Sequence, residues 1–257
     1  LVQKHVGRGT FVTIPNRLEG DDPERMGETT SIQYNFSSLS PSPDFFPVED
    51  IKTFINQVLD QDRGQAFSYQ AGQGYSPLRK HIKKMLKQEG IEAGEENIQI
   101  ISGAQQGIDI VAKILLDHGD TLFVEDPTYP GSLATFRSRG AQVMGIPLGR
   151  KGLDMDKLEE YLQDFHPHLF YVMTSFQNPT GYTYSPEEKE NLLKLAYRYN
   201  FYLLEDDYLS ELDFSSSKHP PMRAFDRWER VILLKSYSKI LMPGLRIGFL
   251  VIPNQLK

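Results

Sequence analysis

Alternating apolar segments predict an α/β domain over most of the chain. Seven runs rich in apolar residues, each bounded by turn-forming residues, are typical of strands: 98–102, 121–125, 142–146, 169–174, 201–205, 231–235 and 248–252. Helical periodicity fills most of the gaps between them, over residues 105–117, 130–139, 154–164 and 185–199. Several strands are nearly all apolar, so both of their faces must be covered. The pattern therefore indicates a mostly parallel sheet with helices on both faces.

Two more helices are predicted before the first of these strands. The helix over 47–60 carries its apolar residues on one face: Val48, Ile51, Ile55, Val58 and Leu59. The helix over 77–89 turns another apolar set inward and stops at Gly90: Leu78, Ile82, Met85 and Leu86.

The N-terminal segment has a different character. Residues 1–15 indicate two short strands around the turn Gly7-Arg8-Gly9, and Pro15 ends the second strand. Residues 16–33 are polar and unpatterned, which is typical of a linker. The dense α/β pattern begins at about residue 34. The sequence starts at Leu1 rather than Met, so we expect the natural polypeptide to begin upstream.

Composition narrows the classes of protein that remain. The 257 residues include no cysteine, which excludes disulfides, thiolate metal sites and cysteine nucleophiles. No apolar run reaches membrane-spanning length and no signal peptide is visible, so a cytoplasmic protein without a membrane partner is expected. A net charge of −6 argues against a general nucleic-acid binder. The first 17 residues are the exception, because they hold four basic residues and no acid.

Polar residues that could carry chemistry follow several of the predicted strands, where parallel sheets bind their ligands. Lys239, in Ser236-Tyr237-Ser238-Lys239, could form a Schiff base if its pKa were lowered. Arg246 presents a planar fork suited to phosphate. A single surface lysine is nevertheless the commoner explanation for any one lysine taken alone.

Three other strand ends carry candidates. The acids of Glu205-Asp206-Asp207-Tyr208 follow an apolar strand, and one of them could keep a pyridinium nitrogen protonated, although a solvated acidic turn explains them equally well. Asn178, in Asn178-Pro179-Thr180-Gly181, could donate to a ring oxygen, or the segment could be an ordinary turn. Tyr129 could stack on an aromatic ring, or serve the core.

The turn Ser102-Gly103-Ala104-Gln105-Gln106-Gly107 joins a strand to a helix. Its small residues would let backbone N–H groups approach a phosphate at the helix N-terminus, although tight strand–helix turns need glycine for other reasons as well.

The order and spacing of these motifs resemble one family. From Tyr34 onward the chain looks like the large domain of fold-type I aminotransferases, in the branch with the pattern S-x-S-K-x-x-x-P-G-x-R-x-G, which here spans Ser236 to Gly248. The N-P-T-G motif, the acidic strand end and the lysine motif occur in family order. The stretch Tyr69 to Arg79 matches the family pattern Y-x-x-x-x-G-Y-x-P-L-R.

The resemblance implies an aspartate-aminotransferase-like fold, pyridoxal 5'-phosphate as cofactor, and a role for each matched residue. Lys239 would hold the cofactor as a Schiff base and act catalytically, and Asp206 would pair with the pyridinium nitrogen. Tyr208 and Asn178 would hydrogen-bond the ring phenolate oxygen, and Tyr129 would stack on the ring. The phosphate would be bound by residues of three segments: Gly103, Ala104, Gln105, Ser236 and Arg246. Tyr69 would reach the phosphate of a neighbouring subunit, which implies a homodimer.

The N-terminal segment extends the resemblance. Val6 to Val12 is similar to the end of the wing in GntR-type winged helix-turn-helix domains. A wing, a linker and an aminotransferase-like domain together resemble MocR-type transcriptional regulators. The expected domains are thus a wing remnant over 1–15, a linker over 16–33 and the cofactor-binding large domain over 34–257. The DNA-reading helices would lie upstream of Leu1, and the family's small C-terminal domain, with the arginine that grips a substrate carboxylate, would follow Lys257.

These sequence features are consistent with three alternative functions. The first is a regulator that senses an amino acid or amine through external aldimine formation at Lys239 and binds DNA through its upstream domain. The second is a working aminotransferase that uses Lys239 as acid and base. The third is a scaffold that kept the fold and lost the cofactor.

Overall fold

The computed structural model describes residues 2–5, 9–12, 41–214 and 219–257, and it divides into two units, Leu1–Leu39 and Ser40–Lys257. In the first unit, β1 (Val2–His5) pairs antiparallel with β2 (Gly9–Val12), with Val2 opposite Val12 and His5 opposite Gly9. The predicted strand pair is thereby confirmed. The expected linker over 16–33 lies outside the described residues, and the wing assignment stays a prediction.

The second unit contains an eight-stranded sheet in the order β3-β10-β9-β8-β7-β4-β5-β6, which ends in the short strand β6 (Gly152–Leu153). Seven of its strands match the predicted ones within a few residues: β3 (Ile98–Ile101), β4 (Thr121–Asp126), β5 (Gln142–Gly149), β7 (Leu169–Val172), β8 (Tyr202–Asp207), β9 (Val231–Ser236) and β10 (Gly248–Val251). The central run from β5 through β4, β7 and β8 to β9 is parallel, whereas β10 runs antiparallel to both β9 and β3. The aspartate-aminotransferase-like α/β fold is therefore as the sequence predicts.

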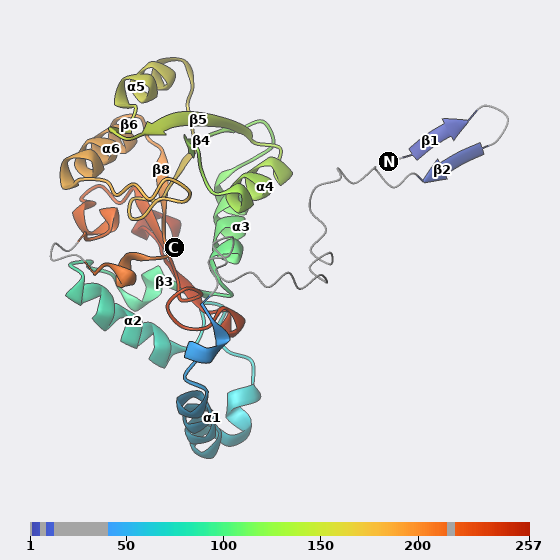
Figure 1. Cartoon of the computed structure of the whole chain (residues 1–257), viewed down its shortest axis with the longest axis vertical. Coiled ribbons are helices and arrows are strands. Elements are labelled where there is room, and N and C mark those ends of the chain that lie inside the picture. Colours follow the sequence, from blue (N-terminus) through green and yellow to red (C-terminus); the bar gives the residue numbers. More distant parts are fainter. Residues whose placement is uncertain (1, 6–8, 13–40, 215–218) are drawn as a thin grey trace, which may run out of the picture. The chain divides into compact units, whose positions relative to one another are not determined.

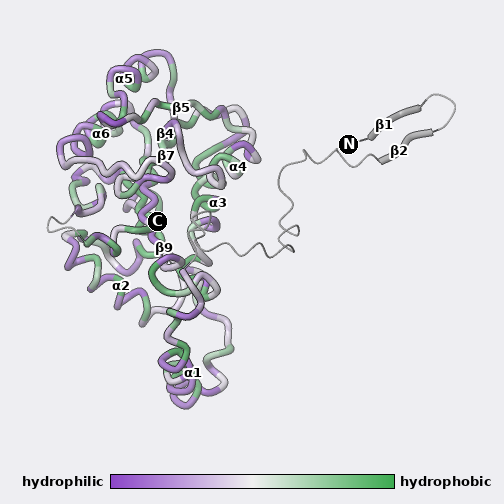
Figure 2. Tube along the Cα trace, viewed as in Figure 1, coloured by the Kyte–Doolittle hydropathy of each residue, from purple (hydrophilic) through white to green (hydrophobic). Residues whose placement is uncertain are grey.

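Helices cover both faces of this sheet, as expected. They are α2 (Ser76–Gln88), α3 (Ala104–Leu115), α4 (Pro130–Ser138), α5 (Met155–Asp164) and α6 (Pro186–Arg198). Figure 1 shows this unit with helices such as α2, α3 and α6 around the strands. Side chains alternate across a strand, so Phe170 and Val172 of β7 pack toward α5 and α6, while Leu169 and Tyr171 pack toward α3 and α4. A third cluster joins α2 to Phe249 and Val251 of β10. Figure 2 shows hydrophobic colouring along the strands and alternating colouring along helices such as α5 and α6.

Local sequence explains where α6 begins. Ser185 accepts a hydrogen bond from the Glu188 backbone N–H at 3.2 Å, and Glu188 accepts one from the Ser185 N–H at 2.7 Å. This capping box satisfies two donors that the first turn of a helix cannot pair, and Pro186 suits the first helical position.

The predicted helix over 47–60 forms as α1 (Val48–Asp62), but none of its side chains is buried in the single chain. Its apolar face remains open to solvent, with Phe54 and Ile55 each more than half exposed. Among the helices of the described residues, none is long and apolar enough to cross a membrane.

Candidate functional site

One edge of the sheet gathers most of the candidate residues. The parallel strands β4, β7, β8 and β9 end together there. Tyr129 and Asn178 follow β4 and β7, Asp206 lies near the end of β8, and the Ser236–Lys239 turn starts at the last residue of β9. Both β3 and β9 are antiparallel to β10, so β3 also ends at this edge, with Gly103 after it. Arg246 lies just before β10, which starts at the same edge. The topology therefore brings together residues that are far apart in the sequence.

The three acids at the end of β8 have different environments. Glu205 faces the α6 side, where it accepts hydrogen bonds from the backbone N–H groups of Met222 and Arg223 at 2.5 and 2.9 Å. Asp207 accepts from the Ser210 hydroxyl at 2.7 Å and lies 3.4 Å from the ammonium of Lys235. Both carboxylates are thus engaged within the protein.

Asp206 is different because only half of its carboxylate is engaged. Its Oδ2 accepts a hydrogen bond from the Tyr171 hydroxyl at 2.6 Å, whereas the buried Oδ1 has no partner among the described residues. A buried acceptor without a donor is costly. Of the three acids, Asp206 is therefore the one with an oxygen left to accept from a bound molecule.

Burial raises the pKa of Asp206 from 3.8 to about 7, with the Tyr171 hydrogen bond opposing the rise and Asp207 adding to it. Since the folded-state pKa lies above the unfolded one, the stabilising contribution of this group is present below about pH 4 and is lost as pH rises through about 7. At about 1.4 kcal/mol per pKa unit, the loss is on the order of 4 kcal/mol.

The Asp206→Asn variant cannot ionise at this position, so the cofactor-free variant should not lose this stability as the pH rises. The variant should unfold with nearly the wild-type free energy at pH 4 and be more stable than the wild type at pH 8. Urea unfolding at several pH values measures the difference, and Asp109→Asn, on the surface of α3, is the matched control. A constant difference across the pH range would contradict the assigned environment.

Lys239 lies in the turn that follows β9 and is half buried. Among the described residues, its amine takes part in no hydrogen bond or ion pair. The same turn is held by Ser236, whose hydroxyl accepts from the Ser238 backbone N–H at 3.3 Å and lies 3.1 Å from the Ser238 hydroxyl. The amine is thus presented on an ordered turn with no internal partner.

The N-terminus of α3 forms the expected anion cradle. The backbone N–H groups of Ala104 and Gln105 belong to the first helical turn and have no acceptor in the described part of the chain. Gly103 precedes them with φ +84°, and a Cβ there would collide with the Arg246 guanidinium. Arg246 itself donates to the Ser102 carbonyl at 3.0 Å. Glycine is therefore required where the guanidinium and the helix end meet.

The segment after β7, which carries Asn178, is fixed by a buried carboxylate that sequence reasoning missed. Glu125, at the end of β4, accepts hydrogen bonds from the Met173 N–H, the Gln177 amide and the Tyr184 hydroxyl at 3.2, 3.0 and 2.8 Å. Burial raises the pKa of Glu125 to about 8 despite these donors. The Asn178 side chain itself makes no hydrogen bond within the described residues.

The two tyrosines expected at the ring are placed on either side of that segment. Tyr208 donates its hydroxyl to the Phe176 carbonyl at 2.8 Å, and it would have to exchange this acceptor in order to donate to a ring phenolate oxygen. Tyr129 caps α4, and its ring lies against Gly131. Tyr69 is fully exposed, so its side chain is not held by packing within its own chain.

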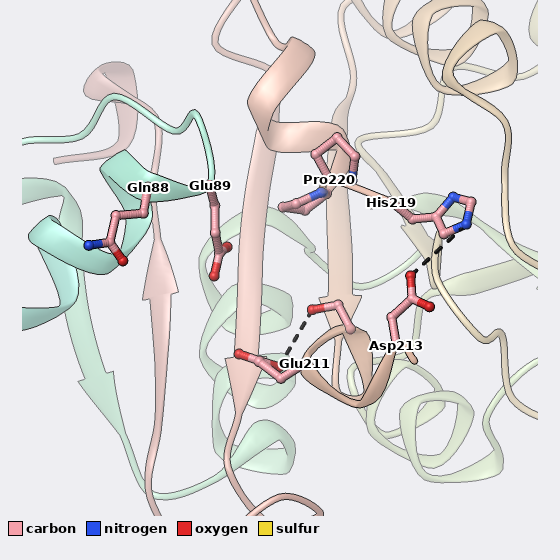
Figure 3. Close-up of a pocket in the computed structure, with 8 residues that line it drawn as sticks. Gln88, Glu89, Glu211, Asp213, His219 and Pro220 are labelled. Carbon is pink, nitrogen blue, oxygen red and sulfur yellow. Dashed lines mark hydrogen bonds and ion pairs between the residues drawn. The ribbon is translucent and has the colours of Figure 1, made fainter. Parts of the chain in front are cut away.

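A second polar feature, which the sequence did not reveal, surrounds the buried Lys235. Its ammonium lies within 3.4 Å of the carboxylates of Glu89, Asp207 and Glu211. Beside it is a hollow of about 410 Å³ lined by eight residues (Figure 3): Gln88, Glu89, Ser210, Glu211, Asp213, His219, Pro220 and Pro221. The lysine near the end of β9 is therefore a structural cation, and the candidate nucleophile is the lysine four positions later.

These features fit pyridoxal 5'-phosphate. The buried Asp206 Oδ1 lacks a donor among the described residues, and a protonated ring nitrogen would supply one. A lysine amine without a partner and a helix N-terminus with an adjacent arginine suit the aldehyde and the phosphate. Fold and site together define a cofactor-binding domain of the aminotransferase type.

The chain belongs to the class I and II aminotransferase family, whose sequence profile matches residues 35–257. It is 36% identical over 217 residues to an uncharacterised aminotransferase of Saccharolobus solfataricus, covering 82% of this chain and 54% of that protein. It is 34% identical over 252 residues to a protein of Rhizobium meliloti named "Probable rhizopine catabolism regulatory protein MocR", covering 98% of this chain and 50% of that one.

Solved structures agree with this assignment. The α-aminoadipate aminotransferase LysN of Thermus thermophilus, in complex with N-(5'-phosphopyridoxyl)-L-leucine, superposes with a TM-score of 0.79 at 33% identity, over 86% of this chain and 56% of that one. Pyridoxal 5'-phosphate is thus the cofactor of the domain. The chain spans about half the length of the relatives it matches.

Proposed function

We propose that this chain is the sensor part of a pyridoxal-phosphate-dependent transcriptional regulator. The observation that carries the proposal is the extent of the match to MocR, which covers 98% of the chain and therefore reaches into the segment before the aminotransferase domain. The antiparallel strands β1 and β2 in that segment would be the two strands of a wing. Matches to the aminotransferases of S. solfataricus and Thermococcus litoralis cover only 82%.

The site residues would each perform one task. When bound, pyridoxal 5'-phosphate supplies an aldehyde that combines with primary amines, and a ring that withdraws electrons. Lys239 would hold that aldehyde, and Asp206 would keep the proton on the ring nitrogen. Asn178 and Tyr208 would hydrogen-bond the ring oxygen, and Tyr129 would lie on the ring face. The phosphate would be bound by residues of three segments: Ala104, Gln105, Ser236 and Arg246.

Sensing follows from competition for the aldehyde. An amino acid or amine would compete with Lys239 for that aldehyde and would leave the lysine amine free. The two occupancies would then differ in charge and contacts at the edge of the sheet. An effector can shift a conformational equilibrium only through such a difference. DNA binding would be a property of the domain upstream of β1, and the altered state of the aminotransferase-like domain would be transmitted to it.

A second copy of the chain is the partner that we propose for α1. Its open apolar face is followed directly in the chain by exposed Phe67 and Tyr69, the residue expected to reach a neighbouring subunit. One dimer contact would cover the apolar face and employ Tyr69 at the same time. Sedimentation equilibrium of the protein should show a dimer, and a monomer at all concentrations would contradict this.

A working aminotransferase is the second candidate, because relatives such as the 2-aminoadipate transaminase of Thermus thermophilus share 34% identity over 220 residues. Titration with amino acids in the presence of 2-oxo acids separates the two. A regulator should show a saturable change in the cofactor spectrum with little or no multiple turnover, together with effector-dependent operator binding by the full-length protein. Sustained turnover without operator binding would overturn the proposal in favour of the enzyme.

A further inference from the structure

Tyr171 is a fully buried tyrosine whose hydroxyl lies against the unusual carboxylate of the site. The phenol oxygen is 2.6 Å from Asp206 Oδ2, and the two residues are 0% and 5% exposed. Strands β7 and β8 are parallel neighbours, with Tyr171 opposite Leu204. Because side chains alternate, Tyr171, Leu204 and Asp206 lie on one face, and the long tyrosine side chain reaches the carboxylate that begins two residues farther toward the strand end.

The tyrosine ring has little freedom to move. It packs in the cluster between the sheet and the α3–α4 layer, with its centroid 5.7 Å from that of Phe136 in an edge-to-face arrangement of 64°. Burial, and then the charge of Asp206, raise the pKa of Tyr171 well above its ordinary value, so the hydroxyl keeps its proton and can only donate to this acceptor. The packed ring therefore holds the hydroxyl donor beside the Asp206 carboxylate.

The hydrogen bond from Tyr171 to one carboxylate oxygen of Asp206 leaves the other oxygen available as an acceptor. With Oδ2 engaged, Oδ1 is the free acceptor, and it is buried without a partner among the described residues. Other groups around Asp206 give it no cation, since Asp207, Glu125 and Tyr208 are its titratable neighbours. The Tyr171 hydroxyl is thus the one internal group that stabilises the charged form of Asp206 in the described structure.

We propose that Tyr171 is a positioning residue for the ring nitrogen of the cofactor. Its hydroxyl orients the Asp206 carboxylate and supports its negative charge. Asp206 Oδ1 would then be placed to accept a hydrogen bond from the protonated ring nitrogen. The inference rests on the proposed placement of the cofactor's ring nitrogen at Asp206. A purely structural alternative is that Asp206 only satisfies a buried tyrosine. The two alternatives make different predictions for loss of the Tyr171 hydroxyl. Only a positioning role makes the resulting loss of cofactor affinity depend on the ring nitrogen.

Tyr171→Phe keeps the ring and removes the hydroxyl, and a hydrogen bond to a charged group typically contributes about 1.5–3 kcal/mol. Binding of pyridoxal 5'-phosphate to the cofactor-free protein should therefore weaken roughly 10- to 100-fold. Binding of the analogue in which C–H replaces the ring nitrogen should change by less than about threefold, since that analogue has no proton for Asp206 to hold. Asp206→Asn should show the same selectivity for the natural cofactor.

Tyr184→Phe is the matched control. Tyr184 is equally buried and also donates to a buried carboxylate, Oε1 of Glu125 at 2.8 Å. This carboxylate anchors the Asn178 segment, so the loss should be similar for both ligands. Nitrogen-15 NMR of labelled cofactor provides a second readout, in which Tyr171→Phe shifts the ring-nitrogen signal toward the unprotonated form and Tyr184→Phe does not.

The possible results separate the role of Tyr171 from the binding of the cofactor. An equal loss for both ligands in Tyr171→Phe, or no loss for either while Asp206→Asn remains selective, overturns the role of Tyr171 and leaves the cofactor assignment intact. Failure of the wild-type protein to bind pyridoxal 5'-phosphate overturns the proposed function instead. Circular dichroism and urea unfolding of each variant distinguish a lost hydrogen bond from a lost fold.

Discussion

Lys239→Ala is expected to lose the visible absorption band that wild-type protein acquires with pyridoxal 5'-phosphate. The band reports a covalent bond between the aldehyde and an amine, and within the described part of the chain Lys239 offers an amine that has no ion pair or hydrogen bond, on the turn after β9. The noncovalent contacts remain in the variant, so cofactor should still bind, more weakly and with the spectrum of the free aldehyde.

The matched control for this experiment is Lys113→Ala. Lys113 is exposed on α3 and paired with Asp109 at 2.5 Å, so its loss should leave the band unchanged. Adding an amine such as ethylamine to Lys239→Ala should restore a similar band, because the site still holds the aldehyde. An unaltered band in Lys239→Ala would assign the cofactor to another lysine.

Lys235→Met is expected to lower the free energy of unfolding more than any of the other substitutions proposed for this protein. The Lys235 ammonium, with its side chain 3% exposed, lies between the carboxylates of Glu89, Glu211 and Asp207 at 3.0, 3.1 and 3.4 Å. Burial lowers the pKa of Lys235, but the carboxylates outweigh burial and leave it above its ordinary value, so the residue stays charged. Removing the cation leaves the buried Asp207 carboxylate, beside the partly exposed Glu89 and Glu211, without compensation. Breaking a buried ion pair in this way typically costs about 3–5 kcal/mol.

Urea or thermal unfolding at pH 7 measures this loss. Lys194→Met serves as control, because Lys194 pairs with Glu190 on the exposed side of α6 at 3.7 Å, with both side chains more than half exposed, and such pairs contribute about 0–1 kcal/mol. Burial raises the pKa of Glu89 above its ordinary value, and protonation of Glu89 relieves part of the repulsion, so the deficit of Lys235→Met should shrink as the pH falls. A deficit below that of Lys194→Met would contradict the assigned network.

The fold was largely readable from the sequence because its strands are buried on both faces. The run Val231 to Leu234 has no polar residue, and such runs are typical of central parallel strands. In contrast, β6 (Gly152–Leu153) is too short for any periodicity to indicate it. The helix α1 was predicted from its apolar face, but periodicity does not identify what covers that face, and in the single chain nothing among the described residues buries it.

The site was readable only to the level of motifs. The order and spacing of the motifs, together with the family resemblance, predict Lys239, Asn178 and the acidic end of β8 as site residues. The choice of Asp206 over Glu205 and Asp207 depends on which face of the sheet each carboxylate occupies and on which of its oxygens has no partner. Tyr171 and Glu125 lie in apolar strands and resemble core residues in the sequence. Their contacts with Asp206 and the Asn178 segment arise from pairing between strands that are distant in the chain, which no local pattern records.

Reductive trapping tests the central claim most directly. Wild-type protein incubated with pyridoxal 5'-phosphate is treated with borohydride, which makes the bond between cofactor and lysine permanent, and its peptides are then mapped by mass spectrometry. The structure predicts a single stoichiometric adduct on Lys239, in the segment between β9 and β10, that is lost when an excess of a bound amino acid displaces the lysine beforehand. Adducts spread over exposed lysines, or a dominant adduct at another position, would contradict the assignment of this chain as a pyridoxal-phosphate domain built around Lys239.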